Sequence, residues 1–221
     1  NKEYDKTIAT YSYILSTDPN YFANDRLVLR IAQSYFEKAN FLEAADWYLR
    51  LIQEFPTSVL IRKAYFGKAR SEEAARFFEN AIESYIGFIQ KFPDHPRLDL
   101  ITFLVGKMYF NMERYVDAIY YWEDLRSKFP LSAYRYEALI NMARAYLEIA
   151  RSESAIAAVR ESQKLKGTDE EIRSSMRREA ITALRMVVDN KALEGSDEYF
   201  DAASELADGY YAAGDLDTGL K

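Results

Sequence analysis

The sequence contains no cysteine and a single histidine, His95, among its 221 residues. These absences remove the usual ingredients of cysteine and histidine zinc sites, of thiolate catalysis and of Ser-His-Asp arrangements. Apolar runs such as Ile101–Val105 stop far short of the roughly 20 residues that a membrane-spanning helix needs. Nucleotide-binding glycine patterns and metalloprotease motifs are also absent from the sequence. We therefore expect a protein that is not an enzyme and that uses no cofactor and no metal.

The charge of the chain is acidic and unevenly distributed. Lys and Arg number 29 and Asp and Glu number 35, so the formal net charge is −6. This balance disfavours nucleic acid as a partner, because such binding needs a basic face. From Asp189 to the end, nine acidic residues stand against Lys191 and Lys221, a net charge of −7. We expect a solvated helical face there; a repulsive or cation-facing patch is the alternative.

A repeat of 37 residues organises most of the chain. Prolines recur at this interval, and small residues, tyrosines, alanines and aromatics stand at constant distances before them. The prolines are Pro19, Pro56, Pro93 and Pro130; the small residues Ala32, Ala69, Gly106 and Ala143; the tyrosines Tyr35, Tyr109 and Tyr146; the alanines Ala44, Ala81 and Ala118; and the aromatics Tyr11, Tyr48, Tyr85 and Trp122. A fifth copy keeps Ala155 but has Gly167 where the proline would stand. Such regular spacing indicates a repeat architecture.

Within each copy the columns predict two packed helices. In the second copy, Ile31, Ala32 and Tyr35 share one face of a helix, and Tyr48 and Leu51 belong to the matching stripe of the next helix. The small residue lets the two helices approach closely. The proline then ends the second helix, because it cannot continue the hydrogen-bond ladder. One pair alone cannot cover its apolar face, so the pairs must stack.

These columns resemble the tetratricopeptide repeat (TPR), whose W-x₂-L-G-x₂-Y…A-x₃-F…P pattern they follow from residue 4 to about residue 167. The resemblance implies an all-α, right-handed superhelical solenoid of antiparallel helix pairs. It implies a TPR-like array over residues 1–167, with a partial first repeat followed by four repeats of 37 residues, and an irregular helical continuation over residues 168–221. The usual TPR period is 34 residues. The lengthened period resembles bacterial envelope TPR proteins of the outer-membrane assembly lipoprotein and Tol-Pal coordinator types.

One column breaks in the third repeat. Glu72 stands where Tyr35, Tyr109 and Tyr146 stand in other copies. A carboxylate in a column of packed tyrosines favours a local departure from the repeat geometry. We therefore expect an irregular third helix pair.

The two ends of the chain also depart from the repeat. A capping box, Thr168 with Glu171, predicts a new helix that runs to Val188, and Ser196–Gly219 is typical of a further first helix and its turn. The sequence begins and ends within a repeat, and an uncapped repeat exposes an apolar face. We expect either a fragment of a longer array or ends that meet another surface.

The TPR resemblance implies a concave groove, lined by the first helix of each pair, that holds a partner segment. Large apolar residues beside cations recur on this face, where they could accept apolar anchors and pair with carboxylates. The partner-binding candidates are Arg26, Leu29, Gln33, Phe36, Lys63, Phe66, Arg70, Phe103, Lys107, Phe110, Ile140 and Arg144. The alternative is that some of the phenylalanines fill the space between pairs. The Lys and Asn pattern that clamps chaperone tails in this family is absent, so we expect an apolar or amphipathic ligand with acidic residues.

The function that follows is a non-catalytic scaffold for protein–protein interaction, with a protein or peptide partner in the groove. The alternative is a structural subunit of a larger bacterial envelope assembly, which joins copies or neighbours through its array ends and so self-associates. The lengthened repeat favours a periplasmic or envelope location, and a cytoplasmic location is the alternative.

Overall fold

The structure, a computed structural model, describes residues 2–18, 21–164 and 166–213, and every regular element in these ranges is helical. The chain divides into two compact units, Asn1–Leu98 and Asp99–Lys221, which are called unit 1 and unit 2 below. Within the described residues, no helix combines the length and the apolar character needed to cross a membrane.

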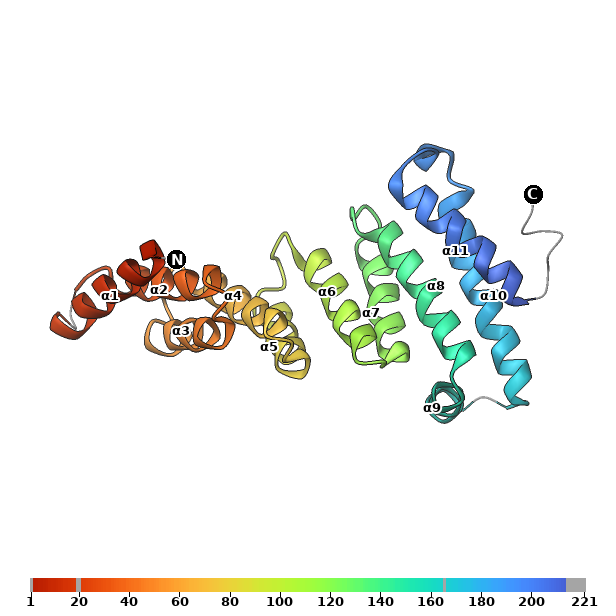
Figure 1. The fold of residues 1–221 in the computed structure, drawn as a ribbon, viewed down its shortest axis with the longest axis horizontal. Helices are drawn as coiled ribbons and strands as arrows, with labels where there is room; N and C mark the ends of the chain where they lie inside the picture. The colour runs from red at the N-terminus through yellow and green to blue at the C-terminus, as the bar shows by residue number, and fades with distance from the viewer. Residues whose placement is uncertain (1, 19–20, 165, 214–221) are drawn as a thin grey trace. The chain divides into compact units, whose positions relative to one another are not determined.

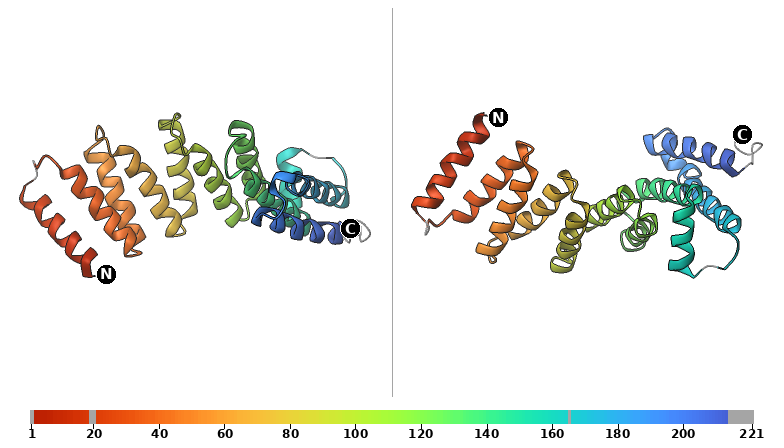
Figure 2. Two further views of the ribbon diagram at one scale, coloured as in Figure 1. Left: turned by 90° about the horizontal axis from the view of Figure 1, so that it is seen from above. Right: turned by 60° about the horizontal axis from the view of Figure 1, so that its bottom comes forward.

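Unit 1 is built from helices that follow one another in space in chain order (Figures 1 and 2). They are α1 (Lys2–Thr17), α2 (Asn24–Glu37), α3 (Phe41–Glu54), α4 (Ile61–Ala74) and α5 (Phe78–Lys91). Helices α2 and α3 form the second repeat, and α4 and α5 form the third. Helix α1 corresponds to the predicted second helix of a partial first repeat; Pro19, which was expected to end it, lies outside the described residues.

The turn inside each regular pair has one fixed form. Its central residue is Ala39 in the second repeat and Arg76 in the third, with φ of 60° and 64°. The chain closes the helix with a bond from the amide of the next residue to a carbonyl five residues back, such as Asn40 N to Tyr35 O at 2.9 Å. This is the Schellman pattern of a helix end, adopted here without glycine.

The repeated prolines end the second helices as predicted. Phe55 and Phe92 precede Pro56 and Pro93, cap α3 and α5, and leave the helical conformation with ψ of 56° and 62°. The conformation before a proline is restricted in this way because the ring crowds the preceding residue.

The predicted columns form the core of unit 1. Ala32, Ala44 and Ala69 are fully buried, and Ala32 and Ala44 belong to one apolar cluster with Tyr48 and Leu51. Burial of these columns in the second and third repeats is what stacking of repeats requires.

The expected irregularity of the third pair is wrong. Helices α4 and α5 have the same 14-residue lengths and the same turn as α2 and α3. Glu72 is buried and accepts hydrogen bonds from Lys68 Nζ at 2.5 Å and from Ser84 Oγ at 2.6 Å, while Lys68 also donates to Ser84 at 2.8 Å. A buried carboxylate is tolerated when it is paired in this way, so the polar cluster of Lys68, Glu72 and Ser84 preserves the geometry.

Unit 2 contains the remaining helices of the described chain. They are α6 (Leu98–Asn111), whose first residue closes unit 1, α7 (Tyr115–Lys128), α8 (Arg135–Arg151), α9 (Glu153–Gln163), α10 (Asp169–Val188), the short 3₁₀ helix η1 (Lys191–Leu193) and α11 (Asp197–Ala213). Helices α6 and α7 repeat the regular pair, with Glu113 at φ 59° in the turn.

At Gly106, the small-residue column leaves no room for a side chain. A Cβ added there would lie 2.4 Å from Trp122 Nε1. Trp122 is almost fully buried, and its indole donates a hydrogen bond to Phe103 O at 3.2 Å. Trp122 is therefore a structural residue, as expected, and glycine gives it the room it needs.

Helix α8 is the centre of unit 2. One of its faces, with Met142 and Ile149, joins a cluster built on Trp122 of α7, and the other, with Leu139 and Ala143, packs on α10 and α11. In Figure 1, α8 lies between α7 and α10. A helix buried on two sides needs apolar residues around most of its circumference, which the sequence of α8 provides.

The fifth repeat does not form a pair of the regular kind. Helix α8 continues to Arg151, and Ser152 begins α9 at once by accepting a hydrogen bond from Ala155 N at 3.2 Å, so this repeat lacks the left-handed turn of the other copies. Helix α9 has only 11 residues and runs across the direction of α8 (Figures 1 and 2). Because the chain passes through a serine cap and not through a left-handed turn, α9 packs on α8 in another direction than the second helices of the regular pairs pack on their first helices.

The continuation after residue 167 is helical, as predicted. Both hydrogen bonds of the Thr168 and Glu171 capping box are present at the start of α10. Helix α11 matches the expected further first helix and packs on α10 and α8. Its expected turn lies outside the described residues.

Candidate functional site

A cleft opens between α2 and α4, the first helices of two successive repeats of unit 1. It has a volume of about 280 Å³ and is called the unit 1 cleft below. Its lining residues are Leu29, Gln33, Phe36 and Glu37 of α2, Tyr48 of α3, and Lys63, Phe66, Gly67 and Arg70 of α4. Six of the predicted groove residues thus meet at one place: Leu29, Gln33, Phe36, Lys63, Phe66 and Arg70.

The floor of the unit 1 cleft depends on Tyr48 and Gly67. A Cβ at position 67 would lie 2.4 Å from Tyr48 Cζ, so any larger residue would displace the tyrosine ring. Burial raises the pKa of Tyr48 to about 12, with a further contribution from Glu37 and an opposing one from Arg70. The phenol therefore stays protonated at neutral pH and remains a hydrogen-bond donor.

The apolar walls of the unit 1 cleft are two half-buried phenylalanines. Phe66 packs edge-on against Tyr85 and Phe88, with ring centroids 6.0 and 6.1 Å apart. Phe36 packs edge-on against Phe41 at 5.3 Å. Aromatic neighbours hold each ring in place while part of it stays open, an arrangement that suits an apolar anchor from a partner.

Two cations border these rings. The Arg70 guanidinium carbon lies 5.4 Å from the centre of the Phe36 ring, a cation–π distance. Within the described part of the chain, neither Arg70 nor Lys63 forms an ion pair with a carboxylate. Glu37 is the one acidic residue of the lining, so the cleft presents two available cations against one anion.

Sequence reasoning missed three lining residues, Glu37, Tyr48 and Gly67. Tyr48 had been assigned to the core stripe, which is correct, since only 6% of it is exposed. Gly67 carried a signal that was not used: its column holds Arg30, Leu104 and Asn141 in other copies, so a glycine there indicates a local close approach.

The structure places the other candidates differently. Arg26 is exposed on α2 but does not line the unit 1 cleft. In unit 2, Phe103 is buried, with 3% exposed, and stacks on Tyr134 at 5.3 Å. Lys107 lies over the Phe103 ring and 3.9 Å from Glu137. Phe110 is half-buried against Tyr115. Phe103 is therefore part of the interior, the alternative considered for these phenylalanines.

The two fifth-repeat candidates are occupied by the chain itself. Ile140 is buried in the cluster that α8 shares with α10 and α11. Arg144 pairs with Glu205 of α11 at 2.7 Å. A return of the chain by α11 covers this part of α8, and a repeat column alone could not show such a return.

Comparison with known proteins decides the family. Residues 24–166 match the family model YfiO, described as outer membrane lipoprotein. The chain belongs to this family. The match covers the second to fifth repeats and so includes both helices of the unit 1 cleft.

Solved structures of low sequence identity share the fold. MamA residues 41 to the end from Desulfovibrio magneticus RS-1 has a TM-score of 0.60 at 12% identity, over 89% of this chain and 89% of that chain. A MamA RS-1 double mutant has 0.61 at 12%, over 89% and 88%. The TPR-like repeats of a putative kinesin light chain from Podosopora anserina have 0.59 at 15%, over 88% and 89%. The comparison with curated proteins gave no match.

Together these matches establish the family and the fold class. The YfiO-family chain is an all-α solenoid of TPR-like repeats. The family description associates the family with the outer membrane.

Proposed function

We propose that this protein is a non-catalytic scaffold and that the unit 1 cleft binds a segment of a protein partner. The observation that carries the proposal is the convergence of Phe36 and Phe66, both partly open, with Lys63 and Arg70, which have no carboxylate partner in the described residues. A partner segment with an apolar anchor next to an acidic residue would satisfy both features. The family description supports a periplasmic location for this activity.

Site-specific photo-crosslinking tests the proposal. A photoreactive phenylalanine analogue replaces Phe36 in the cleft or, as a control, Tyr120 on α7, which is 64% exposed and lies outside the lining. We expect crosslinks to a partner from envelope extract of the source organism at position 36 and none at position 120. The crosslinked peptide should contain an acidic residue beside an apolar one.

A matched pair of variants makes the test specific. Phe66→Ser with Arg70→Gln removes one ring and one cation of the cleft and should reduce crosslinking at least tenfold. Phe77→Ser with Arg76→Gln makes the same chemical change outside the lining, on a side chain that is 50% exposed, and should leave crosslinking unchanged. Equal crosslinking in both variants would overturn the proposal.

Exposed aromatic residues near both ends of the described chain favour a second function, assembly with other subunits. Tyr13 of α1, Phe200 and Tyr211 of α11 are 70%, 61% and 75% exposed. Such residues suit an interface between copies or neighbours. Sedimentation at increasing concentration should then show a rising mass that Tyr13→Ser or Tyr211→Ser reduces; a constant monomer mass would exclude self-association.

A further inference from the structure

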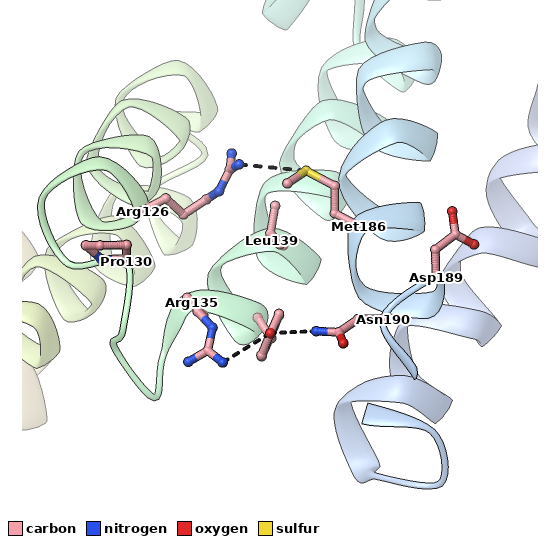
Figure 3. A pocket seen from close by; sticks show the side chains of 8 residues that line it. Arg126, Pro130, Arg135, Leu139, Met186, Asp189 and Asn190 are labelled. Carbon is pink, nitrogen blue, oxygen red and sulfur yellow. Dashed lines mark hydrogen bonds between the residues drawn. The ribbon is translucent and has the colours of Figure 1, made fainter. Parts of the chain in front are cut away.

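A second cleft lies in unit 2, where the end of α7, the start of α8 and the end of α10 meet (Figure 3). It has a volume of about 470 Å³ and is called the unit 2 cleft below. It shares no residue with the unit 1 cleft, and neither the family description nor the repeat pattern assigns it a role.

Within the described residues, the Tyr136 hydroxyl in this cleft accepts two hydrogen bonds and donates none. The phenol oxygen accepts from Asn190 Nδ2 at 2.6 Å and from Arg135 Nη2 at 3.1 Å. Ala192 N donates to Asn190 Oδ1 at 3.1 Å, which fixes the orientation of the amide. Because both acceptor positions of the phenol oxygen are used, its O–H hydrogen remains to be donated.

Two arginines add further donors without a matching anion. The hydrogen-bond partner of Arg126 is the weak thioether acceptor of Met186, at 3.7 Å. Arg135 donates to the carbonyl of Ser132 at 2.8 Å and lies over the Tyr136 ring. Neither guanidinium pairs with a carboxylate in the part of the chain that the structure describes. The cleft is therefore rich in donors and positive charge.

The carboxylate among the lining residues does not cancel this charge. Asp189 belongs to the lining, but its carboxylate lies 3.7 Å from Arg185 Nε. Figure 3 shows Asp189 beyond Asn190, away from Arg126 and Arg135. The side of the cleft that holds the two arginines thus faces acceptor-rich ligands.

The repeat pattern explains why the cleft forms beside Tyr136. In two earlier repeats, an aspartate at the start of the first helix accepts a hydrogen bond from the serine of the following loop: Ser58 Oγ to Asp25 at 2.6 Å, and Ser132 Oγ to Asp99 at 2.8 Å. Tyr136 occupies this column in the fifth repeat. It takes Asn190 in place of a loop serine, and the space beside it becomes the cleft.

Apolar walls decide the class of ligand. Pro130, Leu139 and Met186 line the cleft, and Met186 is 48% exposed. Free phosphate would accept hydrogen bonds from the donors but leave the apolar lining exposed to water. A carboxylate flanked by apolar side chains would accept the hydrogen bonds and also cover the apolar lining. We propose that the unit 2 cleft binds a segment of a protein partner in which acidic and apolar residues alternate, with Arg126, Arg135 and the Tyr136 hydroxyl holding a carboxylate.

Methionine methyl NMR tests this proposal on the whole chain. The protein has five methionines, so ¹³C-methyl labelling gives few signals, and Met186→Leu assigns the one in the cleft. The probe is a capped pentapeptide in which leucine alternates with aspartate or glutamate. Its amide isostere, with asparagine and glutamine, is the matched ligand control, and inorganic phosphate is the small-anion control.

We expect the acidic peptide to shift the Met186 signal and the amide isostere to bind at least fivefold more weakly. Arg126→Gln should remove the shift, whereas Lys128→Gln, a change on the same helix outside the lining, should not. The other four methyl signals report that each variant is folded.

Three results would overturn the proposal: equal binding of the isostere, a Met186 shift at lower concentrations of phosphate than of peptide, or no effect of Arg126→Gln. Phe66→Ser with Arg70→Gln should leave the Met186 shift unchanged, because those residues belong to the other cleft. This last variant separates the two proposals, since each can fail without the other.

Discussion

The single histidine, His95, lies in the loop after α5 and packs against that helix. Its ring packs edge-on against Phe88 at 4.8 Å and is only partly exposed. Its Nδ1 accepts a hydrogen bond from Arg97 N at 3.2 Å. Burial lowers the pKa of His95 below its usual value of 6.5, and the charges of Arg62 and Arg97 lower it further.

This environment predicts a pH effect with a definite sign. The folded state binds the His95 proton less readily than the unfolded state, so the contribution of His95 to stability is complete above pH 6.5 and declines as the pH falls toward the folded pKa. One-dimensional NMR of the imidazole should give a pKa below 6.5 in the native protein and about 6.5 in urea. Arg62→Ala should raise the native value; a native pKa at or above 6.5 would contradict this account.

Glycine at position 106 makes a second residue-scale prediction. Gly106→Ala should destabilise unit 2 by about 1–3 kcal/mol, because the new methyl group would displace the Trp122 ring in a closely packed core. Gly87→Ala in α5 is the matched control, because a Cβ there meets nothing within 4 Å, and alanine should gain about 0.5–1 kcal/mol in a helix. Urea denaturation measures both. A stabilised Gly106→Ala variant would show that the ring has room to move.

At the scale of the element, the turns within the regular helix pairs carry backbone strain, because non-glycine residues adopt a left-handed conformation there. Ala39, Arg76 and Glu113 stand at one position of three repeats with φ near 60°, a conformation that costs a non-glycine residue roughly 1–2 kcal/mol. Glycine is common at this position of helix ends, yet none of the three repeats uses it.

Glycine at these turns should therefore stabilise the protein. We expect each of Ala39→Gly, Arg76→Gly and Glu113→Gly to gain about 0.5 kcal/mol, because the relief of strain exceeds the entropy that glycine adds to the unfolded chain. Thermal unfolding followed by circular dichroism measures the gain. Ala45→Gly within α3 is the control and should lose about 1 kcal/mol; a similar loss at the three turns would show that strain is small.

The same elements show what sequence patterns could and could not predict. The spacing of prolines and small residues predicted four helix pairs, and those of the second, third and fourth repeats are regular, because local packing determines them. Glu72 was judged alone, although Lys68 and Ser84 change with it. The fifth pair was misjudged because Ser152 caps α9 where the other copies turn through a left-handed residue.

Where the candidate residues lie depends partly on contacts between distant parts of the chain, which the aligned positions of the repeats do not show. The pattern brought six groove residues to one cleft in unit 1, because neighbouring repeats alone shape it. It failed for Ile140 and Arg144, which α11 covers from more than fifty residues away in the chain. The unit 2 cleft was not foreseen either, because it arises where the repeat is interrupted.

At the scale of the whole molecule, burial is distributed very unevenly among the helices. Helix α1 has no buried residue, and α9 has two, Ile156 and Val159. Helix α8 has nine and joins two apolar clusters. Local opening costs least where few apolar contacts are lost.

Hydrogen exchange should reproduce this order. We expect the amides of α1 and α9 to exchange first and those of α8 last, as measured by mass spectrometry of peptides under native conditions. Tyr13→Ser on α1, an exposed change, serves as the control and should not alter the exchange of α8. Protection of α1 equal to that of α8 would mean that another surface covers α1 in solution.

The polar cluster of Lys68, Glu72 and Ser84 also bears on how the chain finds its fold. Helices of near-identical repeats can pair one copy out of step during folding, and such errors are typical of repeat proteins. A pairing displaced by 37 residues would keep the Lys68–Glu72 ion pair, which lies within α4. It would set this pair against Trp47 or Tyr121, the aromatic residues in the column of Ser84, and so remove the hydrogen bonds of Ser84, at a cost of about 1–3 kcal/mol. The cluster thus makes one repeat chemically different from the rest, and this difference favours the native pairing of helices over the displaced pairing. Refolding of the Lys68→Ile, Glu72→Tyr, Ser84→Tyr variant should accordingly yield more trapped, misaligned species than the parent chain.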